Sequence, residues 1–405
     1  MSDIFERKSD ILRLIKGLDI TPTMYKNAVE KYHNITAYLA ESGVKANIYP
    51  QGSFALGTVI RPVAKDPDAY YDLDFICQLP FSKDKITAEN TRDKVADILE
   101  KSDLYGGKLT VFCNCFTIEY AEVDGVGFKI DIVPAVDESI PEKETLKNLS
   151  KQPKLIETAI AIPKEEKRSF SWITNNPRGY KSWFDDINGP FINQNRQKRR
   201  AMLFEEAKAV YNSVEEIPES LERSSMQRVI QILKYHKSVY YSRLRAGDQL
   251  EPISAILNTI VAKISKRAPS RYDTFDLLQY VLSEIATYSQ HQMLTEKRFF
   301  ELHGLKEVIQ RKNGQWIIEN PANPKDNLAD VWNQNDKIAS AFFKWSQTVA
   351  NDLIDSLQYN DTMFRSRVEG AFGESYVKRV LDKKYSSQVA TIIAPESQVK
   401  PWKKI

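Results

Sequence analysis

Three aspartates in two apolar, strand-like runs are the residues of this sequence best suited to chemistry. Asp72 and Asp74 stand two apart in the run YDLDFICQL at 71–79, so both carboxylates point to the same side of a strand. Asp131 lies in the later run FKIDIV at 128–133 and points away from the apolar residues around it. If the two strands are neighbours, the three carboxylates converge, and like charges so close together repel unless cations lie between them.

Such a cluster favours a displacement at phosphorus that divalent cations assist. Magnesium prefers oxygen ligands and commonly shares the phosphates of a substrate. Two such ions, held about 3.5–4 Å apart, clamp the attacking and the leaving oxygen of an in-line displacement. The turn Gln51-Gly52-Ser53, which follows a predicted strand, fits the same chemistry. Gly52 lets backbone N–H groups approach phosphate oxygens, and Ser53 adds a hydroxyl donor at the start of the next helix.

Each of these signals also has an ordinary interpretation. Acid-x-acid pairs are common in a chain with 54 acidic residues, and a single pair is usually a solvated strand face. A Gly-Ser pair after a strand is usually only a turn. The combination of both with a third acid in a later apolar strand is much rarer, and it favours the functional interpretation.

Hydrophobic periodicity predicts the elements that position these residues. In the first half of the chain the predicted segments are a helix over 3–18, a long helix from Thr21-Pro22 to Gly43, strands near 46–50 and over 71–79, 110–121 and 126–133, and a helix at about 87–101. Residues 137–170, which are charged and contain several prolines and lysines, predict a loop-rich connection with one short strand at most. This half of the chain therefore predicts a mixed α/β sheet.

The second half of the chain predicts helices. Their ranges are 198–212, 221–242, 252–266, 273–288, 294–300, 335–358 and 362–383, and the stretch NPANP at 320–324 interrupts them. The predicted fold class is α+β. A nucleotide-handling sheet lobe would span residues 1–195, a helical lobe would span residues 196–405, and the long N-terminal helix would brace both.

Composition narrows the class of protein. The net charge of +3, from 57 basic and 54 acidic residues, argues against a surface coated in nucleic acid. Three cysteines do not make a disulfide framework, and with four scattered histidines they do not make a zinc site. The chain has no apolar run of 18 residues and no apolar signal region at its N-terminus, which excludes a membrane segment and predicts a soluble cytoplasmic protein.

The wording of the motifs resembles one family. QGSF, YDLDFICQL and KIDIVPA are similar to the bacterial CD-NTases, the DncV-like relatives of cGAS and of the oligoadenylate synthases within the polymerase-β nucleotidyltransferase superfamily. Further similar segments follow in order: WITNNPRGYKSWF, MQRVIQILKY, PISAIL and NPANPKDNLADVW. The resemblance spans nearly the whole chain. It implies a polymerase-β-like sheet lobe followed by a helical core like that of the oligoadenylate synthases.

The resemblance also implies roles for individual residues. Asp72 and Asp74 would bind two Mg²⁺ ions, with Mn²⁺ as an alternative, and Asp131 would bind the ion that activates the attacking ribose hydroxyl. The nucleotide-binding residues it implies are Gln51, Gly52 and Ser53 on the donor triphosphate, Lys234 and its partner Ser254 on phosphate, and Asp330 on the acceptor nucleotide. Without the resemblance, Lys234 reads as a solvated lysine and Ser254 as a residue near a helix N-cap.

The implied activity is the joining of ATP and a second NTP such as GTP into a cyclic di- or trinucleotide, with release of pyrophosphate. The product would be a second messenger that activates an effector in anti-phage (CBASS) defence. We expect a monomer, and no direct activation by DNA because no Cys/His insertion is present. One alternative is an enzyme that makes linear oligonucleotides, of the oligoadenylate or poly(A) type. The other is a catalytically silent module that binds nucleotide or RNA, which would not need the three acids.

Overall fold

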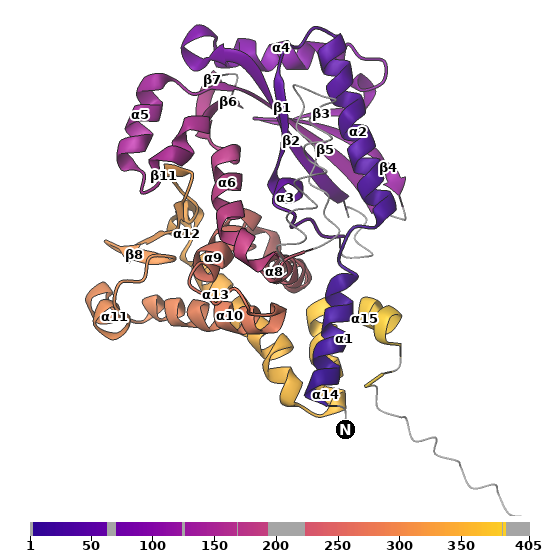
Figure 1. Cartoon of the computed structure of the whole chain (residues 1–405), viewed down its shortest axis with the longest axis vertical. Helices are drawn as coiled ribbons and strands as arrows, with labels where there is room; N and C mark the ends of the chain where they lie inside the picture. The colour runs from indigo at the N-terminus through magenta and orange to yellow at the C-terminus, as the bar shows by residue number, and fades with distance from the viewer. Residues whose placement is uncertain are drawn as a thin grey trace, which may run out of the picture.

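The computed structural model describes residues 3–62, 70–123, 126–167, 169–192, 223–382 and 384–385. Figure 1 shows two parts: a sheet flanked by helices, and below it a bundle of helices. The chain enters through a helix beside the bundle, builds the sheet, and then returns to complete the bundle. The predicted α+β class is therefore confirmed. The predicted helix over 198–212 and the boundary between residues 195 and 196 lie outside the described residues.

Seven strands form one mixed sheet, with the core order β1-β2-β5-β4-β3, and β6 and β7 added beside β5. β2 and β5 are parallel, whereas β1 is antiparallel to β2 and β4 is antiparallel to β5. The strands are β1 (Asn47–Gln51), β2 (Tyr70–Ser82), β3 (Leu109–Val111), β4 (Phe116–Val123), β5 (Val126–Asp137), β6 (Ile160–Glu166) and β7 (Ser169–Asn175). The two strands that carry the aspartates are thus neighbours in the middle of the sheet.

One face of the sheet packs against two helices. The long helix α2 (Pro22–Glu41) begins at Thr21, whose side chain accepts from the Met24 N–H, and has proline in its first turn. Its apolar stripe joins alternate residues of β2 and β5 and the inner face of α4 (Ala88–Glu100) in one core. The opposite face of β2 carries the aspartates and a small apolar cluster around Ile76. The predicted alternation along 71–79 is confirmed.

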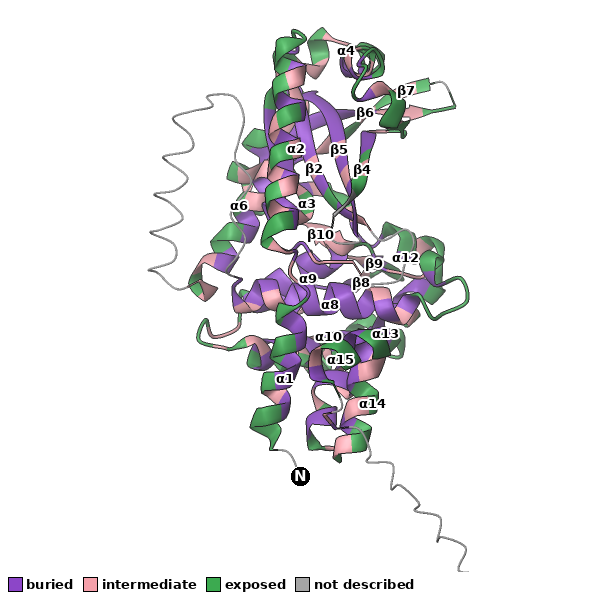
Figure 2. Cartoon of the chain, turned by 90° about the vertical axis from the view of Figure 1, so that its right-hand side faces the viewer, coloured by how far each residue is buried: buried purple, intermediate pink, exposed green. Residues whose placement is uncertain are grey.

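The helical lobe is built around α8 (Ser225–Tyr241), which is buried along most of its length (Figure 2). The helices that surround it are α9 (Ser254–Ser265), α10 (Thr274–Ser289), α11 (Glu296–His303), α13 (Asp336–Leu353), α14 (Asp361–Phe372) and α15 (Glu374–Leu381). The helix predicted over 362–383 is two helices, because Gly373 has a φ of 86° between them. Within the described residues, no helix is both long and apolar enough to span a membrane.

Two segments from the first half of the chain pack into the helical lobe. The apolar residues of α1 (Ile4–Lys16) and of α6 (Pro177–Asn188) belong to the core of that lobe. The bracing predicted for one long N-terminal helix is therefore divided: α1 packs on the helical lobe and α2 packs on the sheet.

Two predicted irregular regions contain regular structure. Residues 137–170, predicted to be loop-rich, form α5 (Ile140–Leu149) and β6, and β7 begins there. The prediction was wrong because none of the charged residues of α5 is buried, so their charges do not oppose a helix. The interruption near 320–324 is a hairpin of β10 (Glu319–Asn320) and β11 (Asn323–Asn327), preceded by a hairpin of β8 (Gln310–Lys312) and β9 (Gln315–Ile317) and followed by α12 (Asp330–Gln334).

Candidate active site

Asp72, Asp74 and Asp131 meet at one point of the sheet. Asp74 and Asp131 are direct register partners across the parallel strands β2 and β5, and Asp72 lies two residues before Asp74 on the same face. One carboxylate oxygen from each residue lies within 4.8 Å of the others. The conditional prediction that the three carboxylates converge if the strands are adjacent therefore holds in the structure. Three carboxylates supply an oxygen-only ligand set, which suits a hard divalent cation.

The surroundings disfavour negative charge on two of these carboxylates. Burial raises the pKa of Asp74 well above its ordinary value, and the charges of Asp72 and Asp131 raise it further. Burial also raises the pKa of Asp131, while a hydrogen bond from Thr117 Oγ1 to Asp131 Oδ1 opposes that rise. Thr117 reaches Asp131 because the two are register partners on β4 and β5. A bound cation would relieve this repulsion, so the residues present fit a metal site.

The predicted phosphate-binding turn lies beside this cluster. β1 ends at Gln51, its register partner is Asp74, and α3 (Gly52–Ala55) follows directly. Gly52 has a φ of +63°, and a Cβ built there would overlap Asp74 Oδ2. Both observations require glycine: the first because of the left-handed backbone, the second because the turn touches the carboxylate.

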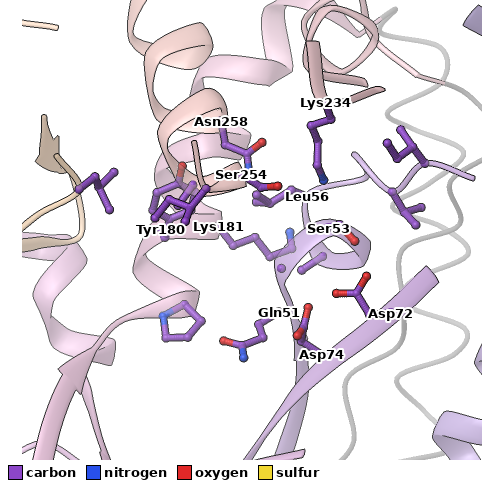
Figure 3. Close-up of a pocket in the computed structure, with 18 of the residues that line it drawn as sticks. Gln51, Ser53, Leu56, Asp72, Asp74, Tyr180, Lys181, Lys234, Ser254 and Asn258 are labelled. Carbon is purple, nitrogen blue, oxygen red and sulfur yellow. The ribbon is translucent and has the colours of Figure 1, made fainter. Parts of the chain in front are cut away.

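A cavity of about 1140 Å³ opens between the sheet and the helical lobe. It is lined by every nucleotide-binding residue that the sequence predicted: Gln51, Gly52, Ser53, Lys234, Ser254 and Asp330. Asp72 and Asp74 line it as well. Figure 3 shows that Ser53 and the two aspartates come from the sheet side, and that Ser254 comes from a helix on the other side. The roles of these residues stay predictions, whereas their gathering at one cavity is a geometric fact.

Lys234 is one of three lysines that line this cavity, together with Lys181 and Lys237. Its side chain extends from α8 toward Ser53 and Asp72 (Figure 3), and only 8% of the residue is exposed. Burial lowers the pKa of Lys234 to about 8, while Asp72 and Asp74 act in the opposite direction. Its Nζ donates to the Thr58 carbonyl at 3.3 Å. Because Lys234 is buried and its ammonium group donates to a backbone carbonyl, it is not a solvated lysine.

The sequence analysis did not predict four other residues at the site, which are Thr117, Asn258, Asn320 and Asp326. Asn258, one turn after Ser254 on α9, lines the cavity with a buried Oδ1 that has no hydrogen-bond partner among the described residues. The helical spacing from Ser254 was a usable signal for it. Asp326 also lines the cavity, and its Oδ2 accepts from Asn320 Nδ2 at 2.8 Å. Asn320 and the strand NPKDN, which contains Asp326, have no hydrophobic periodicity that predicts their pairing. Thr117 was identified only from strand pairing, which places it opposite Asp131.

A known protein family matches the part of the chain that carries the turn and the aspartates. Residues 46–134, which include the turn and all three aspartates, match the family described as "Cyclic GMP-AMP synthase DncV-like, nucleotidyltransferase domain". A c-di-GMP synthase of Roseivirga ehrenbergii is 22% identical over 350 residues, which cover 85% of this chain and 78% of that protein. Residues 46–134 are a DncV-like nucleotidyltransferase domain.

Solved CD-NTase structures share its fold. CdnG of Bradyrhizobium diazoefficiens, solved in complex with GTP, has a TM-score of 0.63 at 18% identity and covers 93% of this chain and 98% of its own. CdnC of E. coli MS115-1, solved in complex with HORMA-deltaN, has a TM-score of 0.54 at 12% identity and covers 91% and 97%. Both likenesses extend through the helical lobe, so the chain shares the two-lobed fold of these structures as well as the nucleotidyltransferase domain.

Proposed function

We propose that this protein is a CD-NTase that acts as a cyclic oligonucleotide synthase, which joins NTPs stepwise into a cyclic di- or trinucleotide and releases pyrophosphate. One observation carries the proposal: three carboxylates from neighbouring strands converge beside a cavity that also presents a glycine turn and a buried lysine. A module that only binds nucleotide would gain nothing from three repelling carboxylates, because each would weaken its hold on a triphosphate.

Asp72, Asp74 and Asp131 would hold two Mg²⁺ ions, with Mn²⁺ as an alternative. When bound, such ions supply Lewis acidity to the phosphate and lower the pKa of the attacking hydroxyl. Asp72 and Asp74 would bind both ions, and Asp131 would bind the ion that activates the attacking ribose hydroxyl. Thr117 would keep Asp131 oriented through its hydrogen bond to Oδ1.

The chain's own residues would position the reacting groups. The Gln51–Ser53 turn, Lys234 and Ser254 would hold the donor triphosphate, and Asp330 would contact the acceptor. The ribose hydroxyl oxygen then bonds to the α-phosphorus, the bond from that phosphorus to pyrophosphate breaks, and the hydroxyl proton passes to Asp131. The rate would come mainly from alignment and from fixed charges that match the transition state.

The size of the cavity favours a reaction between two nucleotides. Sites for one drug-sized ligand usually have volumes of about 300–1,000 Å³. The cavity of about 1140 Å³ exceeds this range and leaves room for an acceptor beside a donor. The similarity to a c-di-GMP synthase along most of the chain supports GTP as one substrate, and we propose ATP as the other.

We also propose a downstream effector, an oligomeric state and a division of the chain into two lobes. The product would activate a separate effector in anti-phage defence, and the synthase would act as a monomer without direct activation by DNA. Residues 1–195 would form the catalytic lobe except for α1 and α6, whose apolar residues pack in the helical lobe that residues 196–405 would complete.

The test is a reaction that contains all four labelled NTPs with Mg²⁺ or Mn²⁺, analysed by mass spectrometry after nuclease and phosphatase digestion. We expect a cyclic product from the wild type, and none from the double variant Asp72→Asn/Asp74→Asn with its fold intact. Full activity of the double variant would refute the mechanism. Linear products that lengthen when an RNA primer is added would replace cyclisation with template-independent polymerisation, and NTP binding without pyrophosphate release would indicate a silent binding module.

A further inference from the structure

A short segment joins the two lobes next to the phosphate-binding turn. We call residues 56–59, which follow α3, the seam segment. Leu56 belongs to the core of the helical lobe, whereas Val59 belongs to the core of the sheet lobe. The seam segment therefore crosses from one core to the other within four residues, and it does so where the cavity walls meet.

The backbone of the seam segment is bonded on two sides. Its N–H groups donate back to the turn and α3: those of Leu56 and Thr58 donate to the carbonyls of Gly52 and Ser53 at 3.2 and 2.8 Å. Its four consecutive carbonyls all accept from side chains of α8 or from Arg223, which lies two residues before that helix. The pairs are Gln227 Nε2 to Leu56 O at 2.9 Å, Arg223 Nη1 to Gly57 O, Lys234 Nζ to Thr58 O at 3.3 Å and Gln231 Nε2 to Val59 O at 2.8 Å.

The contact is too close to admit a side chain. Gly57 has a φ of +64°, and a Cβ built there would overlap the amide nitrogen of Gln227. Glycine is thus required at this position by the backbone conformation and by the approach of α8.

The two glutamines are held so that their NH₂ groups face the seam segment. Gln227 Oε1 accepts from the Ser224 N–H at 2.9 Å as half of a capping box, which leaves its Nε2 for Leu56. Gln231 Oε1 accepts from Arg228 Nη1 at 3.0 Å, and its Nε2 also donates to Asp19 Oδ1 at 3.0 Å. In both residues the carbonyl end is already engaged, so the donor end is fixed on the seam segment.

We propose that Arg223, Gln227 and Gln231 are positioning residues for nucleotidyl transfer. They would hold the Gln51–Ser53 turn at a fixed distance from Lys234. The inference rests on the proposed function, which places the donor triphosphate between these two. The turn and Lys234 belong to different lobes, and Leu56 is the residue of the seam segment that packs in the core around α8. The bonds through the seam segment set the gap between the turn and Lys234, because one side of the segment holds the turn and the other side holds α8.

Lys234 itself donates one of the four hydrogen bonds to the carbonyls of the seam segment. An ammonium group has three donors, and in Lys234 one of them is spent on the Thr58 carbonyl. That bond orients the group, and the remaining donors are available to a phosphate gripped by the turn. A shift of about 1 Å between the two gripping elements is enough to lower a rate by about 10²-fold.

Two variants break the bridge and keep the bond that each glutamine's carbonyl end accepts, although Gln231→Glu also loses the bond to Asp19 Oδ1. In Gln227→Glu, one carboxylate oxygen can still accept from Ser224, but the other presents an acceptor to the Leu56 carbonyl. Gln231→Glu does the same at Val59 and still accepts from Arg228. The matched control is Tyr235→Phe, which removes a buried hydrogen bond from α8 to the Phe372 carbonyl, away from the seam segment.

The experiment measures kcat/KM for product formation, Mn²⁺ affinity by titration calorimetry, and Tm for each variant. We expect kcat/KM to fall about 10- to 100-fold in both glutamate variants, with Mn²⁺ affinity within about twofold of wild type. Tyr235→Phe should keep wild-type kcat/KM even if its Tm falls. Wild-type kcat/KM in a folded glutamate variant would overturn the positioning role, and so would unfolding of both variants, since the bonds would then serve the fold alone. A wild type that makes no product would instead overturn the proposed function.

Discussion

The carboxylate of Asp74 lies so close to Gly52 that a Cβ at position 52 would force the turn or Asp74 to move. The phosphate-binding turn and the metal-ligand cluster are therefore in direct contact. A nucleotide gripped by the turn would have its phosphates next to cations held by the aspartates. The first prediction follows from this contact.

Gly52→Ala should lower kcat/KM by about two orders of magnitude, because the added methyl group must displace either the turn or Asp74. It should also lower the free energy of unfolding by about 1–2 kcal/mol, since alanine is strained at a φ of +63°. Gly43→Ala is the matched control: Gly43 has a φ of +90° but nothing within 4 Å of a built Cβ. It should lose similar stability and keep its activity, as kinetics and thermal denaturation would show. Equal kcat/KM values for the two variants would contradict the contact.

Thr117→Val should shift the acid limb of the pH–kcat/KM profile to higher pH. The Thr117 hydroxyl lowers the pKa of Asp131 by donating to its carboxylate, so the loss of that bond raises the pKa. The carboxylate is then protonated, and the site inactive, at a pH where the wild type still works. We expect a shift of about one pH unit, in line with a hydrogen bond to a charged group. Thr110→Val changes the exposed register partner of Thr117 on β3 and should leave the profile unmoved. A profile that is identical in all three proteins would refute the role of Thr117.

The affinity for NTP should fall as the pH rises through about 8, the pKa to which burial lowers Lys234. Above that pH the amine is neutral and attracts a triphosphate less. Lys234→Met should weaken NTP binding about 10- to 100-fold and abolish this pH dependence, measured by calorimetry with a nonhydrolysable NTP. Lys263→Met is the control, because Lys263 also has a pKa of about 8 but bonds the Glu319 carbonyl away from the aspartates. Retention of the pH dependence in Lys234→Met would show that another group causes it.

Asp74→Asn should not destabilise the metal-free protein at neutral pH. The folded state raises the pKa of Asp74, so it binds this proton more tightly than the unfolded chain does. Stability is therefore lost as the pH rises from the ordinary value of 3.8 through the raised pKa, and asparagine avoids that loss. Mn²⁺ should raise the Tm of the wild type and leave that of the variant almost unchanged. An equal rise in both would place the bound ion elsewhere.

The convergence of the aspartates was predictable only in part. The two-residue period of a strand fixed the side to which Asp72 and Asp74 point, because alternation leaves no other choice. The adjacency of β2 and β5 is a matter of topology, since the chain forms α4, β3 and β4 between them. No local sequence pattern at Asp131 predicts that it pairs with Asp74.

Helix α5 shows a local signal that was present and outweighed. Ser139 accepts from the Glu142 N–H, and Pro141 lies in the first turn, both of which mark a helix start. The charges that follow pointed to a loop, although a helix with one buried residue, Leu146, needs little apolar surface. The capping residue Ser139 was therefore a better guide to α5 than the charges that follow it.

The bonds across the seam segment could not be predicted at all. Gln227 and Gln231 are polar residues on a helix, and glutamine is mostly an exposed residue in folded proteins. They are buried because a distant segment brings four carbonyls to that face of α8. Such long-range satisfaction of backbone groups depends on the assembled fold and leaves no periodic trace in the chain.

The central claim is that Asp72, Asp74 and Asp131 together hold divalent cations against the phosphates of an NTP. A crystal grown with MnCl₂ and a nonhydrolysable NTP tests it most directly, through the anomalous scattering of manganese. We expect two peaks about 3.5–4 Å apart, ligated by the three aspartates and by phosphate oxygens. A bound nucleotide in this cavity with no manganese at the aspartates would contradict the account.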